Sequence, residues 1–375
     1  GLRLLPYSAE RLYGKTVVTA ASRLERFSEC PFAYYVTYNL KARERKVYQV
    51  QPADLGVVFH EVLELFTKRM AAENIPWGSL TREELGARVD GCVEAAVPTE
   101  AALRGTARNQ HILRKVKRIC AASVWALCEH LKRGVFEPAA AELEFSGGNA
   151  GLPVTSLEIF LNEERKLVLT GRIDRVDIMR AADGAVYVKI IDYKSGNVKF
   201  DLAEVLSGVQ LQLILYMKAL LKNAKALFGR AGEENIWLET KPGGVFYFHI
   251  DDPILPAGAA SLDPERKEEM LLKCFRMSGL ALAETEAVTG MDGALAEGGE
   301  SPVIPVSINR NGAFGKTSSV AAFEYFEQLG AAVEEKAKEI GRRMTEGVIT
   351  PDPHVKGRRS ACDFCRYGAV CGNYT

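Results

Sequence analysis

Apolar residues recur at helical spacing in the first third of the chain. The clearest case lies within 54–72, where the repeating positions are Leu55, Val58, Phe59, Val62, Leu63 and Phe66. This spacing predicts an amphipathic helix over 54–72. Weaker patterns predict helices over 20–37, with Ser22 as N-cap, and over 81–97 and 108–133. We therefore expect residues 73–135 to form a helical elaboration.

Further along the chain, the apolar residues follow the shorter period that is typical of β-strands. Runs rich in Val, Ile, Leu and Tyr predict strands over 143–145, 154–161, 167–180, 186–194 and 245–250. Ala182-Asp183-Gly184 is a turn signal, so the strands 167–180 and 186–194 should form a hairpin. Further helices are expected over 202–222 and 320–346. This order of elements indicates an α/β fold.

The remaining segments lack a clear period. Residues 251–300 are rich in Gly, Ala and Glu with several prolines, which indicates an insertion or a flexible surface region, and we place the insertion over 251–310. The tail 350–375 reads as short loops that carry three cysteines. A length of 375 residues with 47% hydrophobic composition suffices for a substantial core, and we expect one domain over 1–375.

Charge does not identify the partner. The chain has 48 Lys and Arg against 48 Asp and Glu, so nucleic-acid binding would need local basic patches. Three candidate patches are Lys41, Arg43, Arg45 and Lys46; Arg114, Lys115, Lys117 and Arg118; and Lys356, Arg358 and Arg359. Such runs are usually solvated faces, and those beside the tail cysteines are the best candidates.

The compartment follows from two further observations. The chain has no run of 18 apolar residues and does not start with a signal-peptide pattern, so we expect a cytoplasmic protein without a membrane span. Its eight cysteines then favour metal ligation or buried thiols over disulfides.

The predicted hairpin carries the sharpest chemistry. Side chains alternate along a strand, so Asp192 and Lys194 share one face. A hairpin centred on Asp183 sets Asp174 opposite Asp192 and brings both carboxylates to that face. A two-residue turn would separate them, so the hypothesis requires an odd-numbered loop or a bulge. Asp177 falls on the other face and is expected to be a surface charge.

Paired carboxylates suit Mg²⁺ or Mn²⁺, and Lys194 would then position a water or offset developing charge. A single Asp-x-Lys is more often a solvated cross-strand pair. His60 and Glu64 share a helical face, as do Gln212 and Tyr216. The alternative for His60 is a core histidine whose hydrogen bonds are satisfied. The alternative for Gln212 and Tyr216 is an ordinary amphipathic helix face.

The terminal cysteines form a second candidate site. Cys362, Cys365 and Cys371 make a C-x₂-C-x₅-C array that suits Zn²⁺ or an iron–sulfur cluster, and by spacing alone Zn²⁺ is at least as good a candidate. The array lacks a fourth ligand. Cys30, which is followed by Pro31, is the candidate because it is the only other cysteine that does not lie in a regular helical pattern. Cys92, Cys120, Cys128 and Cys274 lie in helical patterns and are expected to be buried thiols.

Several short motifs together resemble the RecB-type nucleases of the PD-(D/E)XK superfamily, helicase-associated members above all. In family order these are Ser22–Tyr35, Leu55–Glu64, Gly171–Asp177, Ile191–Gly196, Gln210–Tyr216 and the cysteine array. The resemblance implies a restriction-endonuclease-like core, a mixed central sheet flanked by helices, that hydrolyses DNA with Mg²⁺ or Mn²⁺.

The resemblance also implies residue roles. His60, Asp174 and Asp192 would be metal ligands, Lys194 the catalytic lysine, and Gln212 and Tyr216 would support the site or contact DNA. Cys30, Cys362, Cys365 and Cys371 would hold a [4Fe–4S] cluster, which would staple the tail 350–375 onto 20–37.

The resemblance further implies an exonuclease domain of a helicase–nuclease complex that acts in double-strand-break repair and recombination, with an AddA-like helicase–nuclease subunit as partner. Residues Arg310–Thr317 come nearest to a Walker A loop but lack its first glycine. We therefore expect that this chain does not hydrolyse ATP by itself and that it is part of a longer protein. Two alternatives are a standalone iron–sulfur nuclease of CRISPR adaptation and a catalytically silent DNA-binding scaffold.

Overall fold

The longest strand, β4 (Lys166–Arg180), organises the sheet because its two halves pair with different partners. The computed structural model describes residues 1–42, 52–97, 107–146, 155–229 and 239–372. The first half of β4 lies between β1 (Thr16–Ala20) and β3 (Leu157–Phe160). Its second half lies between β2 (Glu137–Phe145) and β5 (Val186–Lys194).

The sheet continues beyond β5 in mixed orientation. Strand β6 (Thr240–His249) is parallel to β5, β7 (Ser278–Leu282) is antiparallel to β6, and β10 (Val320–Ala321) is parallel to β7. Because β1 also runs parallel to β4 while β2, β3 and β5 run antiparallel to it, the predicted mixed α/β sheet is confirmed.

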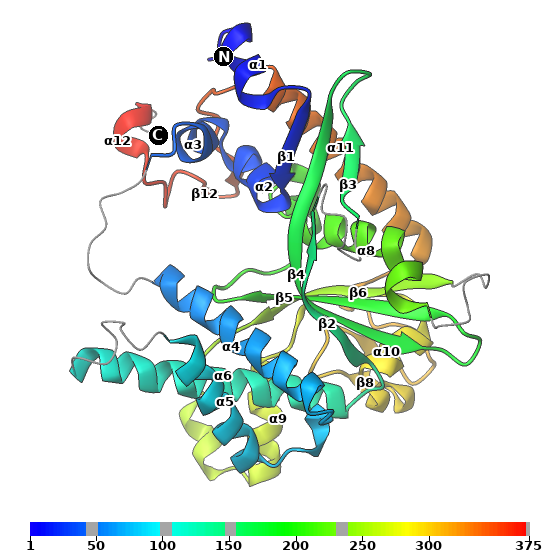
Figure 1. The fold of residues 1–375 in the computed structure, drawn as a ribbon. Coiled ribbons are helices and arrows are strands. Elements are labelled where there is room, and N and C mark those ends of the chain that lie inside the picture. The colour runs from blue at the N-terminus through cyan, green and yellow to red at the C-terminus, as the bar shows by residue number, and fades with distance from the viewer. Residues whose placement is uncertain (43–51, 98–106, 147–154, 230–238, 373–375) are drawn as a thin grey trace.

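Helices cover both faces of the sheet (Figure 1). On one side α4 (Pro52–Ala72), α5 (Arg82–Ala96) and α6 (Ala107–Lys132) pack together. On the other side α8 (Gln212–Phe228) packs against β5 and β6, with α11 (Phe323–Thr345) behind it. Strand β5 is therefore buried on both faces, from Val186 to Tyr193.

The helix predicted over 20–37 is broken into α2 (Ala21–Glu29), α3 (Pro31–Tyr34) and the π-helical turn η1 (Tyr35–Asn39). The break falls at Cys30, whose backbone is extended with φ −169° and ψ 116°. Pro31 lacks an N–H and disfavours the helical region for the residue before it. The N-cap of α2 is Ala20, not Ser22 as predicted.

The helix predicted over 202–222 is also broken, into α7 (Leu202–Ser207) and α8. Gly208 ends α7 in a left-handed conformation with φ 94°, which a glycine adopts without steric cost. The consequence for the site is that Gln212 becomes the first residue of α8.

The segment 251–310 is more ordered than predicted. It contains α9 (Pro264–Cys274), α10 (Thr285–Met291) and the short elements η3 (Ala257–Ser261), η4 (Gly293–Glu297), β8 (Gly299–Glu300) and β9 (Ser307–Ile308). It also contributes β7 to the central sheet, where a side chain at Gly279 would collide with the carbonyl oxygen of Val245. The expectation of a flexible surface insertion was therefore wrong for this strand.

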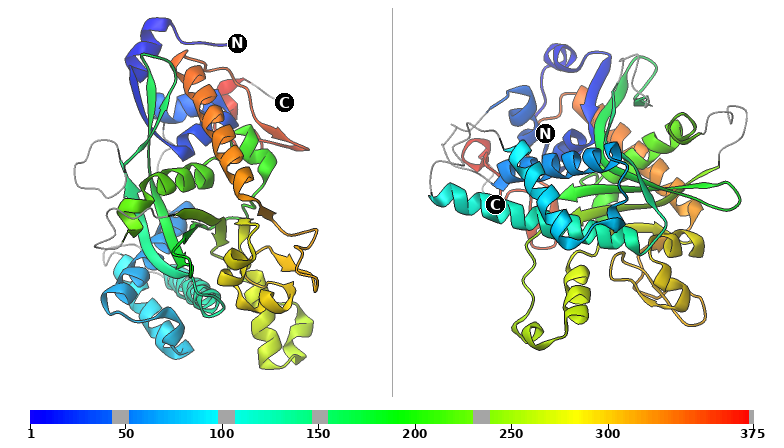
Figure 2. Two further views of the ribbon diagram at one scale, coloured as in Figure 1. Left: turned by 90° about the vertical axis from the view of Figure 1, so that its right-hand side faces the viewer. Right: turned by 60° about the horizontal axis from the view of Figure 1, so that its bottom comes forward.

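The two ends of the described chain lie close together (Figure 2). Near the N-terminal helix α1 (Pro6–Tyr13), the Leu4 amide donates to the Gly347 carbonyl oxygen after α11. The tail, with β11 (Val355–Lys356), β12 (Arg359–Ser360) and α12 (Gly368–Cys371), contacts the end of α2 through a bond from the His354 amide to the Glu29 carbonyl oxygen. None of the described helices combines the length and apolarity needed to cross a bilayer.

Candidate active site

The β4–β5 hairpin aligns the two aspartates. Ala181 and Ala185 pair at its end, so residues 182–184 form the odd-numbered loop that the sequence argument required. Gly184 takes φ 92° there, and the Asp183 side chain accepts a bond from the Ala185 amide. The register that pairs Arg175 with Ile191 sets Asp174 opposite Asp192.

Asp192, Lys194 and Gln212 form a connected group at one end of β5. Lys194 Nζ lies 2.6 Å from Asp192 Oδ2, and Gln212 Nε2 donates to Asp192 Oδ1 at 2.6 Å. Lys194 Nζ also donates to Gln212 Oε1 at 3.4 Å. Burial and the charge of Asp174 raise the pKa of Asp192 to about 6. Burial lowers the pKa of Lys194, but Asp192 outweighs it and keeps the ammonium charged.

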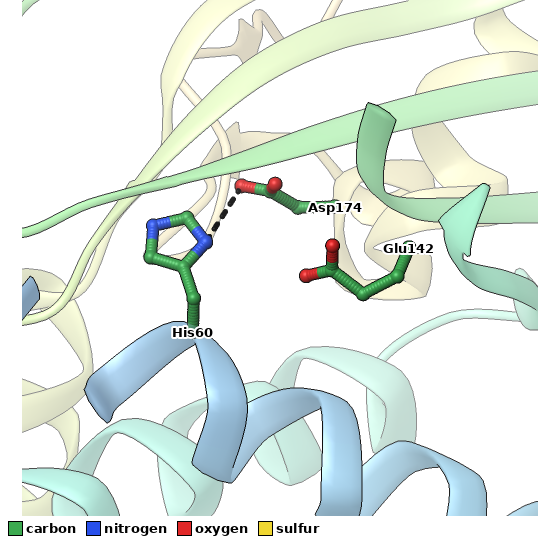
Figure 3. Close-up of side chains that lie close together, drawn as sticks. All are labelled: His60, Glu142 and Asp174. Carbon is green, nitrogen blue, oxygen red and sulfur yellow. Dashed lines mark ion pairs between the residues drawn. The ribbon is translucent and has the colours of Figure 1, made fainter. Parts of the chain in front are cut away.

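A second group, formed by His60, Glu142 and Asp174, lies beside the first, because Asp174 stands opposite Asp192 (Figure 3). His60 from α4 brings its Nδ1 to 3.4 Å from Asp174 Oδ2, and the same oxygen accepts a bond from the Tyr193 amide at 2.7 Å. His60, Asp174 and Glu142 each offer a ligand atom, and these atoms all lie within 4.8 Å of one another. Burial lowers the pKa of His60, but Asp174 outweighs it and raises the pKa above the usual value.

Glu142 is the member of the site that sequence reasoning missed. The β2–β4 register, which pairs Ala141 with Arg175 and Leu143 with Ile173, sets Glu142 opposite Asp174. Its backbone has φ 51°, and its Oε2 lies 2.5 Å from Arg172 Nε. Burial, followed by the charge of Asp174, raises the pKa of Glu142 to about 7. One carboxylate from each of three adjacent strands thus lines up across the sheet.

Tyr216 lies one turn beyond Gln212 on α8 and is buried. Its hydroxyl lies against Gly171, where an added Cβ would come within 2.8 Å of it, and it bonds with the Arg172 backbone. Its ring packs edge-on against Phe145 of β2. Tyr216 therefore braces β4 immediately before Asp174.

Asp177 is not the surface charge that strand alternation suggested. It is fully buried, and aromatic rings cover its two partners, with Trp77 4.6 Å from Arg175 and Phe136 5.0 Å from Lys189. Arg175 Nε lies 2.6 Å and Lys189 Nζ 2.9 Å from its carboxylate oxygens. Burial alone would raise the pKa of Asp177, but the two cations outweigh it and hold the pKa below its usual value.

Two of the four candidate cluster cysteines, Cys30 and Cys365, lie in one packed group although they come from opposite ends of the chain. Cys30 is buried with Ala33, Val36 and Tyr367, and Cys365 packs against this group. The Tyr367 hydroxyl bonds with Thr37 Oγ1 at 2.9 Å, and its amide donates to Cys365 Sγ at 3.4 Å. Cys362 and Cys371 follow in the same tail, and all four are free thiols.

Three of the other four cysteines are buried as expected, and the fourth is exposed. Cys92, Cys120 and Cys128 are buried as predicted, and burial raises the pKa of the last two to about 12. Cys274 was predicted to be buried and is exposed, because it ends the amphipathic helix α9 on its polar side.

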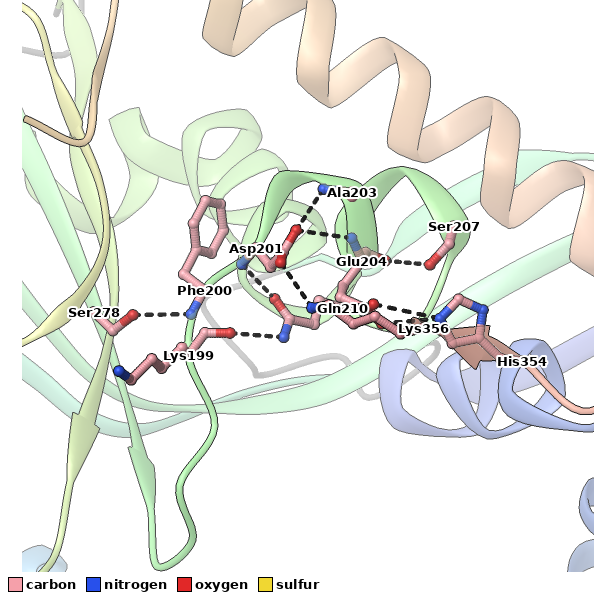
Figure 4. Close-up of polar contacts among 10 residues, drawn as sticks. All are labelled: Lys199, Phe200, Asp201, Ala203, Glu204, Ser207, Gln210, Ser278, His354 and Lys356. Atoms are coloured by element: carbon pink, nitrogen blue, oxygen red, sulfur yellow. Dashed lines mark hydrogen bonds and ion pairs between the residues drawn. The ribbon is translucent and has the colours of Figure 1, made fainter. Parts of the chain in front are cut away.

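Three lysines and arginines of the candidate basic patches pair with acidic side chains in the described part of the chain. Lys117 pairs with Asp90 and Glu94, and Arg118 with Asp252. Lys356 of the tail pairs with Asp201 at 2.7 Å and with Glu204, which His354 also contacts (Figure 4). Arg43, Arg45 and Lys46 lie outside the described residues.

The tail also forms a wall beside Lys194. A cavity of about 580 Å³, called here the tail-side cavity, lies between α2, the end of β5, the start of α8 and the tail. It is lined by Glu25, Lys194, Gln212, Tyr247, Arg359 and Phe364 among others. Phe364, between Cys362 and Cys365, is 94% exposed.

Comparison with known proteins agrees with this geometry. Residues 19–372 match the PD-(D/E)XK nuclease superfamily. The chain is 38% identical over 371 residues to a protein of Caldanaerobacter subterraneus subsp. tengcongensis that is named as the B subunit of an ATP-dependent helicase/deoxyribonuclease, covering 98% of this chain and 31% of that protein. Proteins of the same name from Thermoanaerobacter sp. (strain X514) and Acetivibrio thermocellus are each 37% identical, covering 99% and 98% of this chain.

The chain spans about a third of the length of these relatives, 31% in each case. The family match covers all the residues discussed above, from the start of α2 to the last tail cysteine. This chain belongs to the PD-(D/E)XK nuclease superfamily.

Proposed function

We propose that this chain is a metal-dependent deoxyribonuclease domain that hydrolyses DNA phosphodiesters at the β2–β4–β5 carboxylate row. The observation that carries the proposal is the meeting of Asp174, Asp192 and Lys194 on one face of the hairpin, with His60 beside them. Three buried or half-buried carboxylates side by side repel one another and are costly to bury as anions, and a divalent ion would relieve that cost.

The donor set fits a hard divalent cation. His60, Asp174 and Glu142 already lie at ligand spacing, and Asp192 adjoins them across the hairpin. Oxygen-rich sets of this kind suit Mg²⁺ or Mn²⁺. The bound ion would supply a water of lowered pKa and charge neutralisation at the phosphate.

The protein's own groups would then orient the reaction. Lys194 stays charged and lies within reach of the metal ligands, so it would hold the attacking water or offset charge on the phosphate oxygens. Gln212 bridges Asp192 and Lys194 and would fix their separation. Tyr216 would hold β4 in place from the buried side.

The test is cleavage of labelled single-stranded and duplex DNA by the wild type, Lys194→Ala and Lys199→Ala. Lys199 lies five positions further on and outside the carboxylate row, so it is the matched control. We expect Mg²⁺-dependent cleavage by the wild type and Lys199→Ala, and a loss of at least about 100-fold in Lys194→Ala with DNA binding retained. DNA binding by the wild type without any metal-dependent cleavage would instead identify a silent scaffold.

We also propose that Cys30, Cys362, Cys365 and Cys371 hold a [4Fe–4S] cluster as a structural cross-link. Cys30 and Cys365 belong to one packed group, so thiols from both ends of the chain are available to a shared centre. Arg26 is close enough for its charge to interact with Cys30 and Cys365, which suits thiolate ligands.

The names of the relatives suggest the wider setting. These relatives are named as subunits of ATP-dependent helicase/deoxyribonucleases. We therefore propose that this domain acts as an exonuclease beside a helicase subunit of the AddA type. The setting would be cytoplasmic double-strand-break repair and recombination. The same likeness favours this setting over a standalone nuclease. Co-purification of the full-length protein with such a subunit, and ATP-dependent degradation of DNA ends by the pair, would test it.

A further inference from the structure

Glu25 of α2 reaches across to the start of α8. Its Oε1 accepts a hydrogen bond from the Gln212 amide at 2.8 Å, and the Leu211 amide contributes a second bond. Glu25 also lines the tail-side cavity together with Lys194 and Gln212. Burial raises the pKa of this carboxyl to about 7, against the two amides and Lys194, which lower it.

The start of α8 has no cap of its own. Leu211, at the N-cap position, is in helical conformation and provides no side-chain bond. The first amides of a helix have no partner within the helix, and a carboxylate there is favoured by both hydrogen bonding and the helix dipole. Glu25 therefore performs for α8, from another helix, the task that a local Asp or Ser usually performs.

Gln212 is the residue that this contact fixes, and it is also the bridge within the site. Its backbone is held by Glu25, and its side chain is bonded to Asp192 at 2.6 Å and to Lys194 at 3.4 Å. Lys194 lies among Asp192, Gln212 and the face of the Tyr247 ring, 5.4 Å from its centroid, and it also feels the charge of Glu25. A shift at the start of α8 would move the partners that set the lysine's position.

We infer that Glu25 is a positioning residue of the nuclease site, which acts by holding Gln212 and, through it, Asp192 and Lys194. The inference rests on the proposed function. It also gives the site a physical connection to the cysteine region, because α2 carries Glu25 in its interior and ends at Cys30. No direct contact of Glu25 with DNA or metal is required.

Two substitutions separate the possible roles. Glu25→Gln keeps an oxygen that accepts the amide bonds, whereas Glu25→Ala removes it. A misplacement on the order of 1 Å at a catalytic group lowers the rate about 100-fold. In the full chain, purified anaerobically, we therefore expect Glu25→Ala to lower kcat about 10- to 100-fold with KM changed less than about 3-fold, and Glu25→Gln to recover most of the activity.

Glu334→Ala is the matched control. Glu334 of α11 also reaches α8 from another helix, where it pairs with Lys218, away from Lys194. It should leave kcat unchanged. If loosening α8 in general were the cause, Glu334→Ala and Glu25→Ala would lower kcat alike, and the inference would be overturned.

The double variant Glu25→Ala/Gln212→Ala tests the route. If Glu25 acts through Gln212, the double variant should be no slower than Gln212→Ala alone, since coupled residues are not additive. Multiplicative losses would overturn the inference, as would wild-type kcat in Glu25→Ala. In either case a wild type that cleaves in Mg²⁺ leaves the proposed function standing, whereas a wild type that does not cleave removes that function itself.

Discussion

Asp174 and Asp192 lie opposite each other on β4 and β5, each buried, with Lys194 as the cation bonded to the second of them. Glu142 extends the pair into a row across β2. Such a row stores electrostatic repulsion that protons or a metal ion relieve. Stability and catalysis should therefore respond to pH and metal through the same residues.

The metal-free protein should lose stability as the pH rises from about 4 to about 7. The folded pKa values of Glu142, about 7, and Asp192, about 6, exceed their ordinary values of 4.5 and 3.8 because of burial and then Asp174. Groups with raised folded pKa values stabilise the protein at low pH, and this contribution is lost between the ordinary and the raised value. We expect a loss on the order of 1–3 kcal/mol by denaturant unfolding in EDTA.

Mn²⁺ at a pH of about 7.5 should reverse this loss, because an ion bound only by the folded state stabilises it by mass action. Glu142→Gln should flatten the pH dependence and weaken the response to Mn²⁺. A pH dependence that is unchanged by both the ion and the substitution would separate these carboxylates from a metal site.

The buried network around Asp177 should matter for stability. Asp177→Ala leaves Arg175 and Lys189 without their buried carboxylate, and breaking such a group costs about 3–5 kcal/mol. Chemical denaturation measures the difference. Glu346→Ala, which removes the exposed pair with Arg3, should cost less than about 1 kcal/mol. Equal costs for the two variants would mean that the network contributes no more than a surface pair.

The cysteine cross-link should hold the tail. Cys30→Ala should yield a colourless, iron-poor protein whose tail after 350 is cut readily by protease, because Tyr367 and His354 provide few other contacts with α2, α3 and η1. Iron content, visible absorbance and limited proteolysis of anaerobic samples measure this, with Cys274→Ala as the exposed control. Zinc in the wild type would keep the cross-link and exclude the cluster, while an ordered tail with normal metal content in Cys30→Ala would remove Cys30 from the site.

The parts of the site predicted from sequence depend on strict periodicity. Strand alternation fixed the shared face of Asp192 and Lys194, and the centre of the loop at Asp183 fixed their partner Asp174. Glu142 escaped this reasoning because it precedes the predicted strand 143–145 and sits at a backbone irregularity. Periodicity also cannot show that a second layer covers the hairpin, which is why Asp177 was placed at the surface.

The breaks at Cys30 and Gly208 were missed for a related reason. Apolar spacing continues across both positions, while the local backbone does not. Pro31 was a signal for the first break, and Gly208 for the second. Strand β7 was missed because small residues such as Gly279 and Ala281 pack closely in the sheet without the bulky pattern of a typical strand.

The most direct test of the nuclease site compares Asp192→Asn with Asp183→Asn. Both lie on the same hairpin, but Asp183 only bonds the turn at its tip, and Asn keeps that acceptor. In Mg²⁺ we expect Asp192→Asn to cleave DNA at least about 100-fold more slowly than the wild type while Asp183→Asn cleaves normally and both melt cooperatively. Wild-type cleavage by folded Asp192→Asn would contradict the assignment of the carboxylate row as the catalytic metal site.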